Sequence, residues 1–347
     1  MMPHRQAGHA SDAHAGQPLA LHYCRPDEAR RLVAGDGAHV LGEIHFGGWL
    51  RDLEGARHPH ARVGMTQLDA PPRIELWTSP APVAYDRVGD IAVAESAELL
   101  FGSVSVDPLR EPAFEGAVER HYTAILALIE ARGYPHLLRM WNYFPGIAKV
   151  SASLDRYQHF CRGRYQALAD HFGDFDGKLP SASAVGSSDG PLTIYFIAAR
   201  APGVHRENPR QMSAYRYPPQ YGPRSPSFAR ATLKRFPQGA CLFVSGTASI
   251  VGHESRHPGD PAAQLAETLR NLRALIEDTA RDTGARFDGL AGVSHLKVYL
   301  RDPAFLPLVH AGLDAVIAPG VPRLILRADI CRTDLLLEIE ALVAEAP

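Results

Sequence analysis

The sequence predicts an α+β protein in which two similar halves, each a mixed sheet covered by helices, flank an inserted segment. The first reason is an internal repeat: a β-rich segment, an amphipathic helix and a second strand occur within residues 100–143 and again within residues 242–301. Short matches keep the same order, since Ala-Leu-Ile-Glu at 127–130 recurs at 274–277. In addition, 46% of the 347 residues are hydrophobic, which is enough for two or three core-bearing units.

We predict four segments along the chain. Residues 1–20 are expected to be a disordered tail, residues 21–150 the N-terminal half, residues 151–232 the insert and residues 233–347 the C-terminal half. The first 18 residues lack the hydrophobic core of a signal peptide, and no apolar run reaches the length of a membrane span. We therefore expect a cytoplasmic protein that does not enter a membrane.

Three helices are marked by apolar periodicity and by their terminal residues. The first has apolar residues at three- and four-residue spacings and is expected to stop at Gly133. The second begins at Asp260, an N-cap followed by proline at the first helical position, and ends near Gly284. The third begins similarly at Asp302 and continues to Ile317, after which RLILRADI and LLLEIEALV are expected to be strands.

The insert holds a helical stripe at 154–172, a turn region at 180–191, a strand at 192–199 and an unusual loop at 210–231. That loop, RQMSAYRYPPQYGPRSPSFARA, has four arginines, three tyrosines and four prolines but no acidic residue or lysine. Its prolines exclude a regular helix or a central strand, so we expect a rigid, cationic, phenol-rich loop. The net charge of −2 offers no long-range attraction to nucleic acid, so any anion must be captured by a local cluster such as this one.

Cysteine and histidine spacings do not predict a metal site. The four cysteines stand too far apart for a metal knuckle or a CxxC redox pair. No HxH or HExxH motif falls on an expected helix or strand. We therefore expect neither a metal nor another cofactor.

The second half, from LFVSGTASIVG through VYLRD to the final EIEA, resembles the RidA/YjgF barrel family. Members of that family usually trimerise and bind ligands in clefts between neighbouring barrels. An arginine holds the ligand carboxylate and a glutamate on the last strand acts on the ligand. The resemblance assigns these roles to Arg323 and Glu338. By strand alternation alone, Glu338 would be an ordinary exposed glutamate like Glu340.

Residues 40–345 as a whole resemble the chorismatases, which cleave pyruvate from chorismate. The resemblance is carried by RMWNYFPGI, RYQAL, PSASAVG, SAYRYPPQYGPRSPSFARA and ADICRTDLLLEIEA. It implies two tandem YjgF/chorismate-mutase-like barrel halves, with the active site in a cleft between elements of the two. It also implies chorismate as the small-molecule partner and no metal or redox cofactor. Whether the protein is a monomer or a small homo-oligomer is left open.

The resemblance also implies roles for individual residues. Glu338 becomes the acid that protonates the enolpyruvyl ether, so it should be buried with a raised pKa. Cys331, seven residues earlier, occupies the position at which the family's products differ. Cysteine there accompanies 3-hydroxybenzoate, in some relatives together with 4-hydroxybenzoate, and a small residue accompanies hydrolysis to a dihydroxycyclohexadienoate. The residues expected to bind the substrate are Tyr215, Tyr221, Arg224, Arg139, Asn142, Gly246, Ala248 and Arg323.

Two other functions remain open from the sequence. A RidA-type imine deaminase would use Arg323 and Glu338 but would leave the insert without a role. A non-catalytic module that binds aromatic acids would keep the cleft and lack the acid. Ordinary structural roles are also open: Cys331 could be a core residue, and Arg224 could pair with a surface carboxylate.

Overall fold

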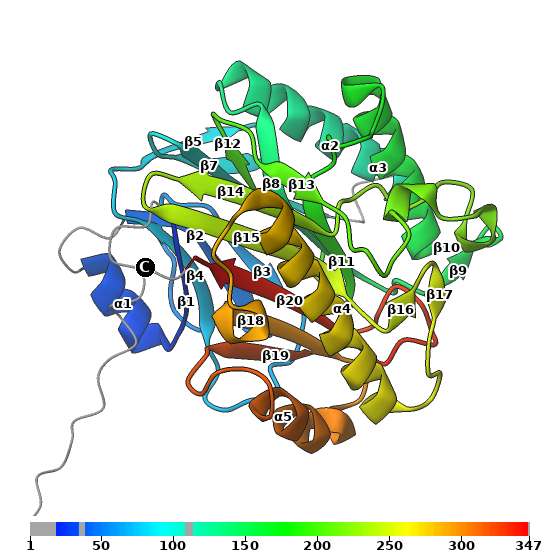
Figure 1. The fold of residues 1–347 in the computed structure, drawn as a ribbon. Helices are drawn as coiled ribbons and strands as arrows, with labels where there is room; N and C mark the ends of the chain where they lie inside the picture. The colour runs from blue at the N-terminus through cyan, green and yellow to red at the C-terminus, as the bar shows by residue number, and fades with distance from the viewer. Residues whose placement is uncertain (1–18, 35–38, 108–113, 346–347) are drawn as a thin grey trace, which may run out of the picture.

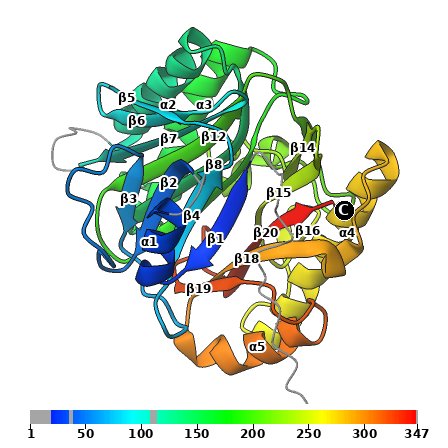
Figure 2. The same ribbon diagram turned by 90° about the vertical axis from the view of Figure 1, so that its left-hand side faces the viewer.

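The computed structural model describes residues 19–34, 39–107 and 114–345, and these residues form three large sheets that share one core (Figure 1). Residues 1–18 of the expected tail lie outside the described residues, whereas Ala20 already begins a strand. Helix α1 (Pro26–Ala34) covers the first sheet (Figure 2). The strands of the first sheet are, in order, β1 (Ala20–Cys24), β4 (Ile74–Ser79), β2 (His39–Phe46) and β3 (His60–Val63).

The second sheet has six strands and is covered by two neighbouring helices, α2 (Phe114–Ala131) and α3 (Arg156–Phe172), at the top of Figure 1. Helix α3 begins with a capping box, in which the Asp155 side chain accepts from the backbone of Gln158 and the Gln158 side chain accepts from the backbone of Asp155. The strand order is β11 (Ser181–Ser187), β8 (His136–Pro145), β12 (Leu192–Ala199), β7 (Leu99–Val106), β6 (Ile91–Glu95) and β5 (Ala84–Val88).

The third sheet also has six strands and packs against α4 (Pro261–Thr283) and α5 (Leu306–Asp314). As expected, α4 is capped by Asp260 and ends at Gly284, which adopts the left-handed conformation. Helix α5 is shorter than expected, because a 3-10 turn, η5 (Pro303–Phe305), replaces its first turn. The strand order is β13 (Val204–Arg206), β14 (Ala231–Phe236), β15 (Gly239–Thr247), β20 (Leu337–Ala344), β18 (Val293–Leu300) and β19 (Arg323–Arg327).

The second and third sheets have the same topology. In each, an outer strand runs parallel to its neighbour and every other neighbouring pair is antiparallel. The α+β class and the two successive units of mixed sheet covered by helices are therefore confirmed. The repeat extends further than the sequence indicated, since α3, β11 and β12 correspond to α5, β19 and β20. Much of the expected insert 151–232 thus belongs to the repeated unit, and the part left over is the loop that contains residues 210–230.

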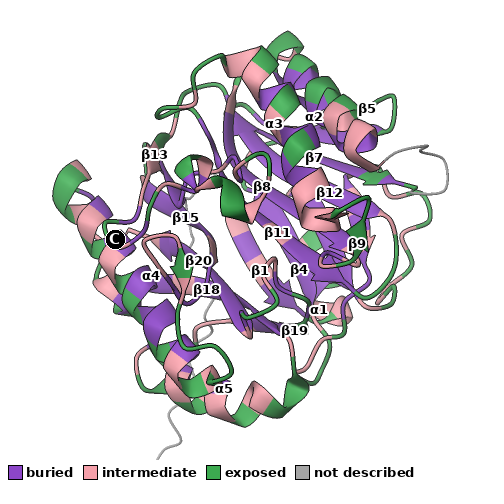
Figure 3. Ribbon diagram, turned by 90° about the vertical axis from the view of Figure 1, so that its right-hand side faces the viewer, coloured by how far each residue is buried: buried purple, intermediate pink, exposed green. Residues whose placement is uncertain are grey.

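The first sheet repeats part of the same pattern. Strand β3 pairs in parallel with β2, and the remaining neighbours in the sheet, β2 with β4 and β4 with β1, are antiparallel. In the chain, α1 lies between β1 and β2. The three sheets turn their inner faces toward one central core that includes Trp77, Trp141 and Tyr299. Their helices cover the outer faces, so the central strands are almost entirely buried, whereas the edge strands β5 and β13 are not (Figure 3). A cleft between two such units is therefore formed within one chain.

Two short hairpins and three further 3-10 turns complete the described structure. No helix within the described ranges is long and apolar enough to cross a membrane. The hairpins are β9 (Val150–Ser151) with β10 (Leu154–Asp155) and β16 (Ile250–Val251) with β17 (Glu254–Ser255), and the turns are η2 (Ala214–Arg216), η3 (Pro219–Tyr221) and η4 (Gly289–Gly292).

Candidate active site

A cavity of about 660 Å³ lies between the second and third sheets. Its walls come from α3 and β11 on one side and from β15 and β20 on the other, and the loop at 210–231 contributes a further wall. Its volume falls in the range of small-molecule sites. Five of the residues expected from the sequence line it: Glu338, Cys331, Tyr221, Gly246 and Ala248.

Glu338 stands on β20 with its carboxyl group at the cavity and a side chain that is only 5% exposed. Burial raises the pKa of Glu338 to about 8, and the negative charge of Glu340 acts in the same direction. Arg139 and Arg230 oppose this shift without reversing it. Glu338 is therefore a neutral carboxylic acid at pH 7, which is the state that a general acid requires.

Gly246 allows this position of the acid. A Cβ atom at residue 246 would fall inside the van der Waals shell of Glu338 Oε1, so any larger residue would displace the carboxyl group. The backbone N–H of Gly246 donates to Ser183 Oγ over 2.9 Å. Strands β11 and β15 are thus joined across the cavity floor beside Glu338.

Glu340 faces a buried ionic network behind the cavity. Its Oε2 lies 3.0 Å from Arg139 Nη2, and it also accepts from Trp141 Nε1 at 2.8 Å. Burial would raise the pKa of Glu340, but Arg139, Lys297 and the hydroxyl donors of Ser183 and Tyr299 hold it below its ordinary value. Glu340 is therefore an ionised carboxylate beside the neutral Glu338, and Arg139 forms an ion pair with Glu340.

Two buried arginines, Arg164 on α3 and Arg230 before β14, line the cavity, and each has at least one buried donor without a partner among the described residues. Arg164 is 2% exposed, and its Nε and Nη2 have no hydrogen-bond partner within the described residues. Arg230 is 3% exposed; its Nη2 donates to the Tyr217 hydroxyl at 2.6 Å, while its Nε is unpartnered. A buried donor without an acceptor costs about 1–3 kcal/mol, and more when it is charged. These donors therefore indicate a site for an anionic ligand.

The four arginines of the loop have different tasks. Arg210 pairs with Glu267 at 2.5 Å, and Arg216 pairs with Asp176 at 2.7 Å. The Arg224 guanidinium lies 4.3 Å from the ring centroid of Tyr165. Only Arg230 lines the cavity. The cationic character of the loop thus serves mainly to fasten it to the body of the protein.

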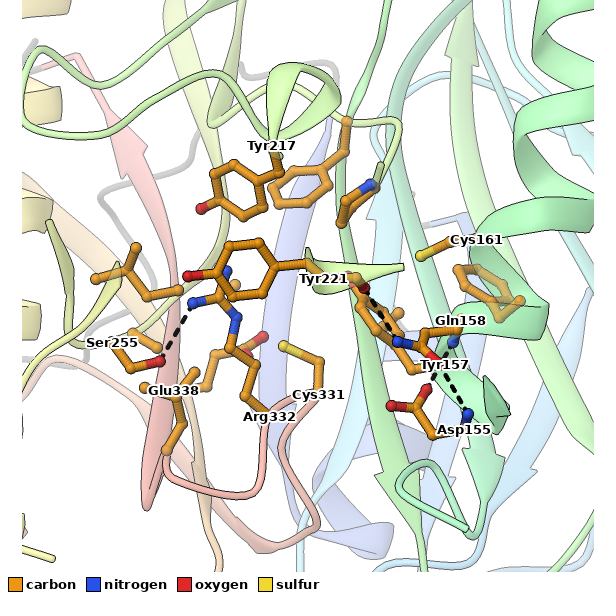
Figure 4. Close-up of a pocket in the computed structure, with 18 of the residues that line it drawn as sticks. Asp155, Tyr157, Gln158, Cys161, Tyr217, Tyr221, Ser255, Cys331, Arg332 and Glu338 are labelled. Atoms are coloured by element: carbon orange, nitrogen blue, oxygen red, sulfur yellow. Dashed lines mark hydrogen bonds between the residues drawn. The ribbon is translucent and has the colours of Figure 1, made fainter. Parts of the chain in front are cut away.

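Cys331 and Arg332 reach the cavity from the segment between β19 and β20. In Figure 4 both lie beside Glu338, with Tyr217 and Tyr221 of the loop above them. The Arg332 guanidinium lies 3.9 Å from the ring centroid of Tyr221, and its Nη1 donates to the His253 carbonyl at 2.8 Å. Burial raises the pKa of Cys331 to about 12, and Glu338 contributes to this shift at the high pH at which it is ionised. The Cys331 side chain is therefore a neutral thiol.

Some residues expected at the site are not brought to the cavity. Arg224 is exposed, and Tyr215 packs against the core under α2 and α3, with its hydroxyl bonded to Asp176 and Ser213. Asn142 is buried, where it donates to the Ser183 carbonyl and accepts from Tyr122. Arg323 pairs with Asp314 at 2.5 Å at the start of β19. Arg139 lies behind the cavity wall, as described above.

Four residues that line the cavity were not among those expected to bind the substrate: Arg164, Arg332, Tyr217 and Arg230. All four stand in motifs that carried the family resemblance, since Arg164 opens RYQAL, Arg332 follows Cys331 directly, and Tyr217 and Arg230 belong to the loop at 210–231. No group of three or more histidine, cysteine, aspartate or glutamate side chains in the described part of the chain is placed to hold a metal ion.

A neutral carboxylic acid that faces unpaired guanidinium groups can protonate a bound anion. The fold and the site thus define an α+β enzyme with a buried, neutral carboxylic acid in a small-molecule cleft. Residues 75–198 match the family model for the N-terminal region of the FkbO/Hyg5-like chorismatases.

Full-length relatives agree with that match. The chain is 41% identical to a chorismatase of Streptomyces rapamycinicus, over 94% of this chain and 99% of the relative. It is 34% identical to a 3-hydroxybenzoate synthase of Streptomyces hygroscopicus, over 90% and 94% of the two chains. A crystal structure of a chorismatase superposes with a TM-score of 0.84 at 36% identity, covering 94% of this chain and 98% of that one. This chain belongs to the chorismatase family.

Proposed function

We propose that the protein cleaves chorismate to pyruvate and 3-hydroxybenzoate, with 4-hydroxybenzoate as a possible minor product. The observation that carries this proposal is the neutral Glu338 in a cavity whose two buried arginines have unpaired donors. The names of two relatives, a chorismatase and a 3-hydroxybenzoate synthase, support the same reaction.

Chorismate suits this cavity because it is a small ring compound with two carboxylates. Each carboxylate must lose its hydration on entry, which is favourable only if charged donors replace the water. Arg164 and Arg230 offer such donors, and guanidinium groups match carboxylates in a bidentate manner. Tyr217 and Tyr221 supply flat walls for the ring. Because the loop that carries these tyrosines is fastened to the body, binding orders few side chains.

The reaction begins with proton transfer from the Glu338 carboxyl group to the methylene carbon of the enolpyruvyl ether. This forms an oxocarbenium-like centre and turns the pyruvyl oxygen into a leaving group. As the bond between the ring carbon and this oxygen breaks, the neighbouring ring hydroxyl attacks that carbon to form an arene oxide. The hydroxyl releases its proton, which restores the acid form of Glu338. Opening and aromatisation of the arene oxide then give the hydroxybenzoate and make the reaction irreversible.

The rate should depend on pH through Glu338. The raised pKa means that the acid form persists from the ordinary carboxyl range up to about pH 8, and that it is lost as the pH rises further. We expect kcat/KM for chorismate to be flat below that point and then to fall about tenfold per pH unit above it. The profile of pyruvate release tests this, and a fall that sets in near pH 4.5 would contradict it.

Cys331 is expected to select the product. Its neutral thiol stands beside Glu338 and fills space that water would need to reach the reacting ring carbon. Cys331→Ala should shift the product from 3-hydroxybenzoate toward the dihydroxycyclohexadienoate while pyruvate release continues. Chromatography of the products from a single incubation measures this shift, and Cys161→Ala, which changes a cysteine that lines the same cavity from α3, is the matched control.

A direct assay separates this function from its competitors. Purified protein is incubated with chorismate, and pyruvate is followed with lactate dehydrogenase; in parallel, 2-aminoacrylate is offered as an imine-forming substrate. Pyruvate from chorismate supports the proposal. Deamination without chorismate cleavage would point to the RidA-type activity, and tight binding with neither reaction would point to a binding module. The pairing of Arg323 with Asp314, away from the cavity, argues against the RidA-type site.

We also propose that the enzyme acts in the cytoplasm as a monomer or small homo-oligomer, with chorismate and not nucleic acid as its partner. The cleft is built from two units of the same chain, so a second copy is not needed to complete it. The formal charge of −2 supports the exclusion of nucleic acid. Light scattering of the purified protein, with and without chorismate, measures the oligomeric state.

A further inference from the structure

The segment 328–336, which connects β19 to β20, is here called the product loop. It carries Cys331 and Arg332 into the active-site cavity. Its ends are fixed: Asp329 and Gly186 exchange two backbone hydrogen bonds, and the Leu336 amide donates to the side chain of Gln264. Parts of its middle are anchored as well, since the Arg332 side chain donates to the His253 carbonyl and Gln264 donates to the Asp334 carbonyl. Cys331 itself makes no backbone hydrogen bond within the described residues, so its position depends on a group that links the two arms of the loop to each other.

One guanidinium group does so from outside the cavity. Arg301, directly after β18, donates from Nε to the Leu335 carbonyl at 3.0 Å and from Nη2 to the Arg332 carbonyl at 3.0 Å. The same Nη2 lies 3.4 Å from the Ile330 carbonyl, and Nη1 lies 3.3 Å from Asp329 Oδ1. Arg301 thus bridges the two arms of the product loop on either side of Cys331, although it does not line the active-site cavity.

We propose that Arg301 is a positioning residue that determines the product by holding Cys331 against the reacting ring. This rests on the proposed function and adds a residue that acts only through the loop. A planar group with several donors can keep two strands of a loop at a set separation, which a flexible ammonium group cannot do as well. When the bridge is lost, the middle of the loop opens more often, the thiol moves away, and water gains access to the ring carbon.

The fold should tolerate the loss of this side chain. Arg301 borders a second cavity of about 250 Å³ on the far side of the loop, and its side chain is 24% exposed. The flanking anchors at Gly186 and Gln264 do not involve the guanidinium. Arg301→Met should consequently fold and keep pyruvate release.

The first readout is the product ratio. For Arg301→Met we expect the fraction of dihydroxycyclohexadienoate to rise about tenfold, the factor that corresponds to one lost net hydrogen bond in the loop. Arg301→Lys keeps the charge and loses the planar guanidinium group. Its fraction of dihydroxycyclohexadienoate should lie between that of Arg301→Met and that of the unmodified protein. The matched control is Arg327→Met: Arg327 lines the same second cavity, but its side chain makes no hydrogen bond or ion pair among the described residues.

The second readout does not need substrate. Alkylation of Cys331 by iodoacetamide, followed by peptide mass spectrometry, reports how often the loop opens, and the buried Cys24, Cys161 and Cys241 serve as internal references. We expect the rate of Cys331 alkylation to rise about tenfold in Arg301→Met and to stay unchanged in Arg327→Met. An unchanged product ratio or an unchanged alkylation rate in both Arg301 variants overturns the proposal. If the unmodified protein releases no pyruvate, the proposed function fails, whereas an unchanged alkylation rate shows instead that Arg301 does not hold the loop.

Discussion

Replacing Glu338 by glutamine is expected to lower pyruvate release from chorismate by about 10²–10⁴-fold, the usual contribution of a general acid. The amide has nearly the shape of the protonated carboxyl group but has no acidic proton to give to the methylene carbon. Since Glu338 is neutral below about pH 8, the exchange places one neutral group where another stood. Binding and folding should therefore change little, and the loss should appear in kcat.

The control for this variant is another carboxylate of the same cavity. Glu254 lines the cavity but is exposed and pairs with Arg256 at 3.0 Å. Glu254→Gln should retain most of the activity, because an exposed ion pair contributes little and the residue lies away from the buried acid. Single-turnover pyruvate release and thermal unfolding of both variants are the measurements. Equal rates for Glu338→Gln and the unmodified protein would remove the basis of the mechanism.

Replacing Arg164 by methionine is expected to lower kcat/KM for chorismate by about 10–150-fold, the factor for a lost hydrogen bond to a charged group. Most of this loss should appear in KM, because the guanidinium holds a carboxylate that stays charged throughout the reaction. Arg164 is the sharper choice of the two arginines, since its Nε and Nη2 have no partner, whereas Arg230 also holds Tyr217.

The same variant should be at least as stable as the unmodified protein when no ligand is bound. Arg164 is a buried charge without an ion pair in the described structure, and its guanidinium lies 5.3 Å and 5.9 Å from the ring centroids of Tyr122 and Phe160. Methionine fills similar space without the desolvation penalty. Arg224→Met is the matched control, because that guanidinium is exposed and stacked on Tyr165. A large loss of kcat/KM in Arg224→Met with none in Arg164→Met would reverse the assignment of the carboxylate site.

The helix ends show how far local chemistry could be predicted. Asp260 and Gly284 bound α4 as expected, because an N-cap and a left-handed C-terminal glycine act within a few residues of the helix. The start of α5 was predicted less accurately, because Asp302 caps the 3-10 turn η5 and the α-helix begins only at Leu306. The 3-10 and α forms differ by little free energy over one turn, so packing decides between them.

The extent of the repeat was underestimated for a similar reason. Helix α3 and strands β11 and β12 were assigned to an insert because their sequences do not resemble those of α5, β19 and β20. The correspondence lies in the pairing order and direction of the strands, which local sequence does not record. The first sheet, a partial third copy, was missed in the same way.

Within the site, the residues near Glu338 could be predicted from sequence motifs, whereas the two arginines proposed to bind the ligand, Arg164 and Arg230, could not. Cys331, Gly246, Ala248 and Tyr221 all line the cavity with Glu338. Arginines 210, 216 and 224 of the loop proved to be anchors, and only Arg230 turns inward. Composition alone cannot distinguish an arginine that anchors the loop from one that binds a ligand. The distinction depends on whether another part of the protein places a partner, such as a carboxylate, next to the guanidinium group.

The sequence by itself determined the class of fold, the caps of α4 and the family, since these depend on short motifs and on periodicity, and the family resemblance in turn pointed to Glu338 as the proposed acid. Only the tertiary structure decided that Glu338 is neutral while Glu340, two residues away, is ionised. Burial acts on both carboxyl groups, but Lys297, opposite Glu340 on the paired strand β18, and Arg139, on β8 of the second sheet, offset its effect only at Glu340. A charge balance of this kind depends on distances through space, which are set when the three sheets pack together.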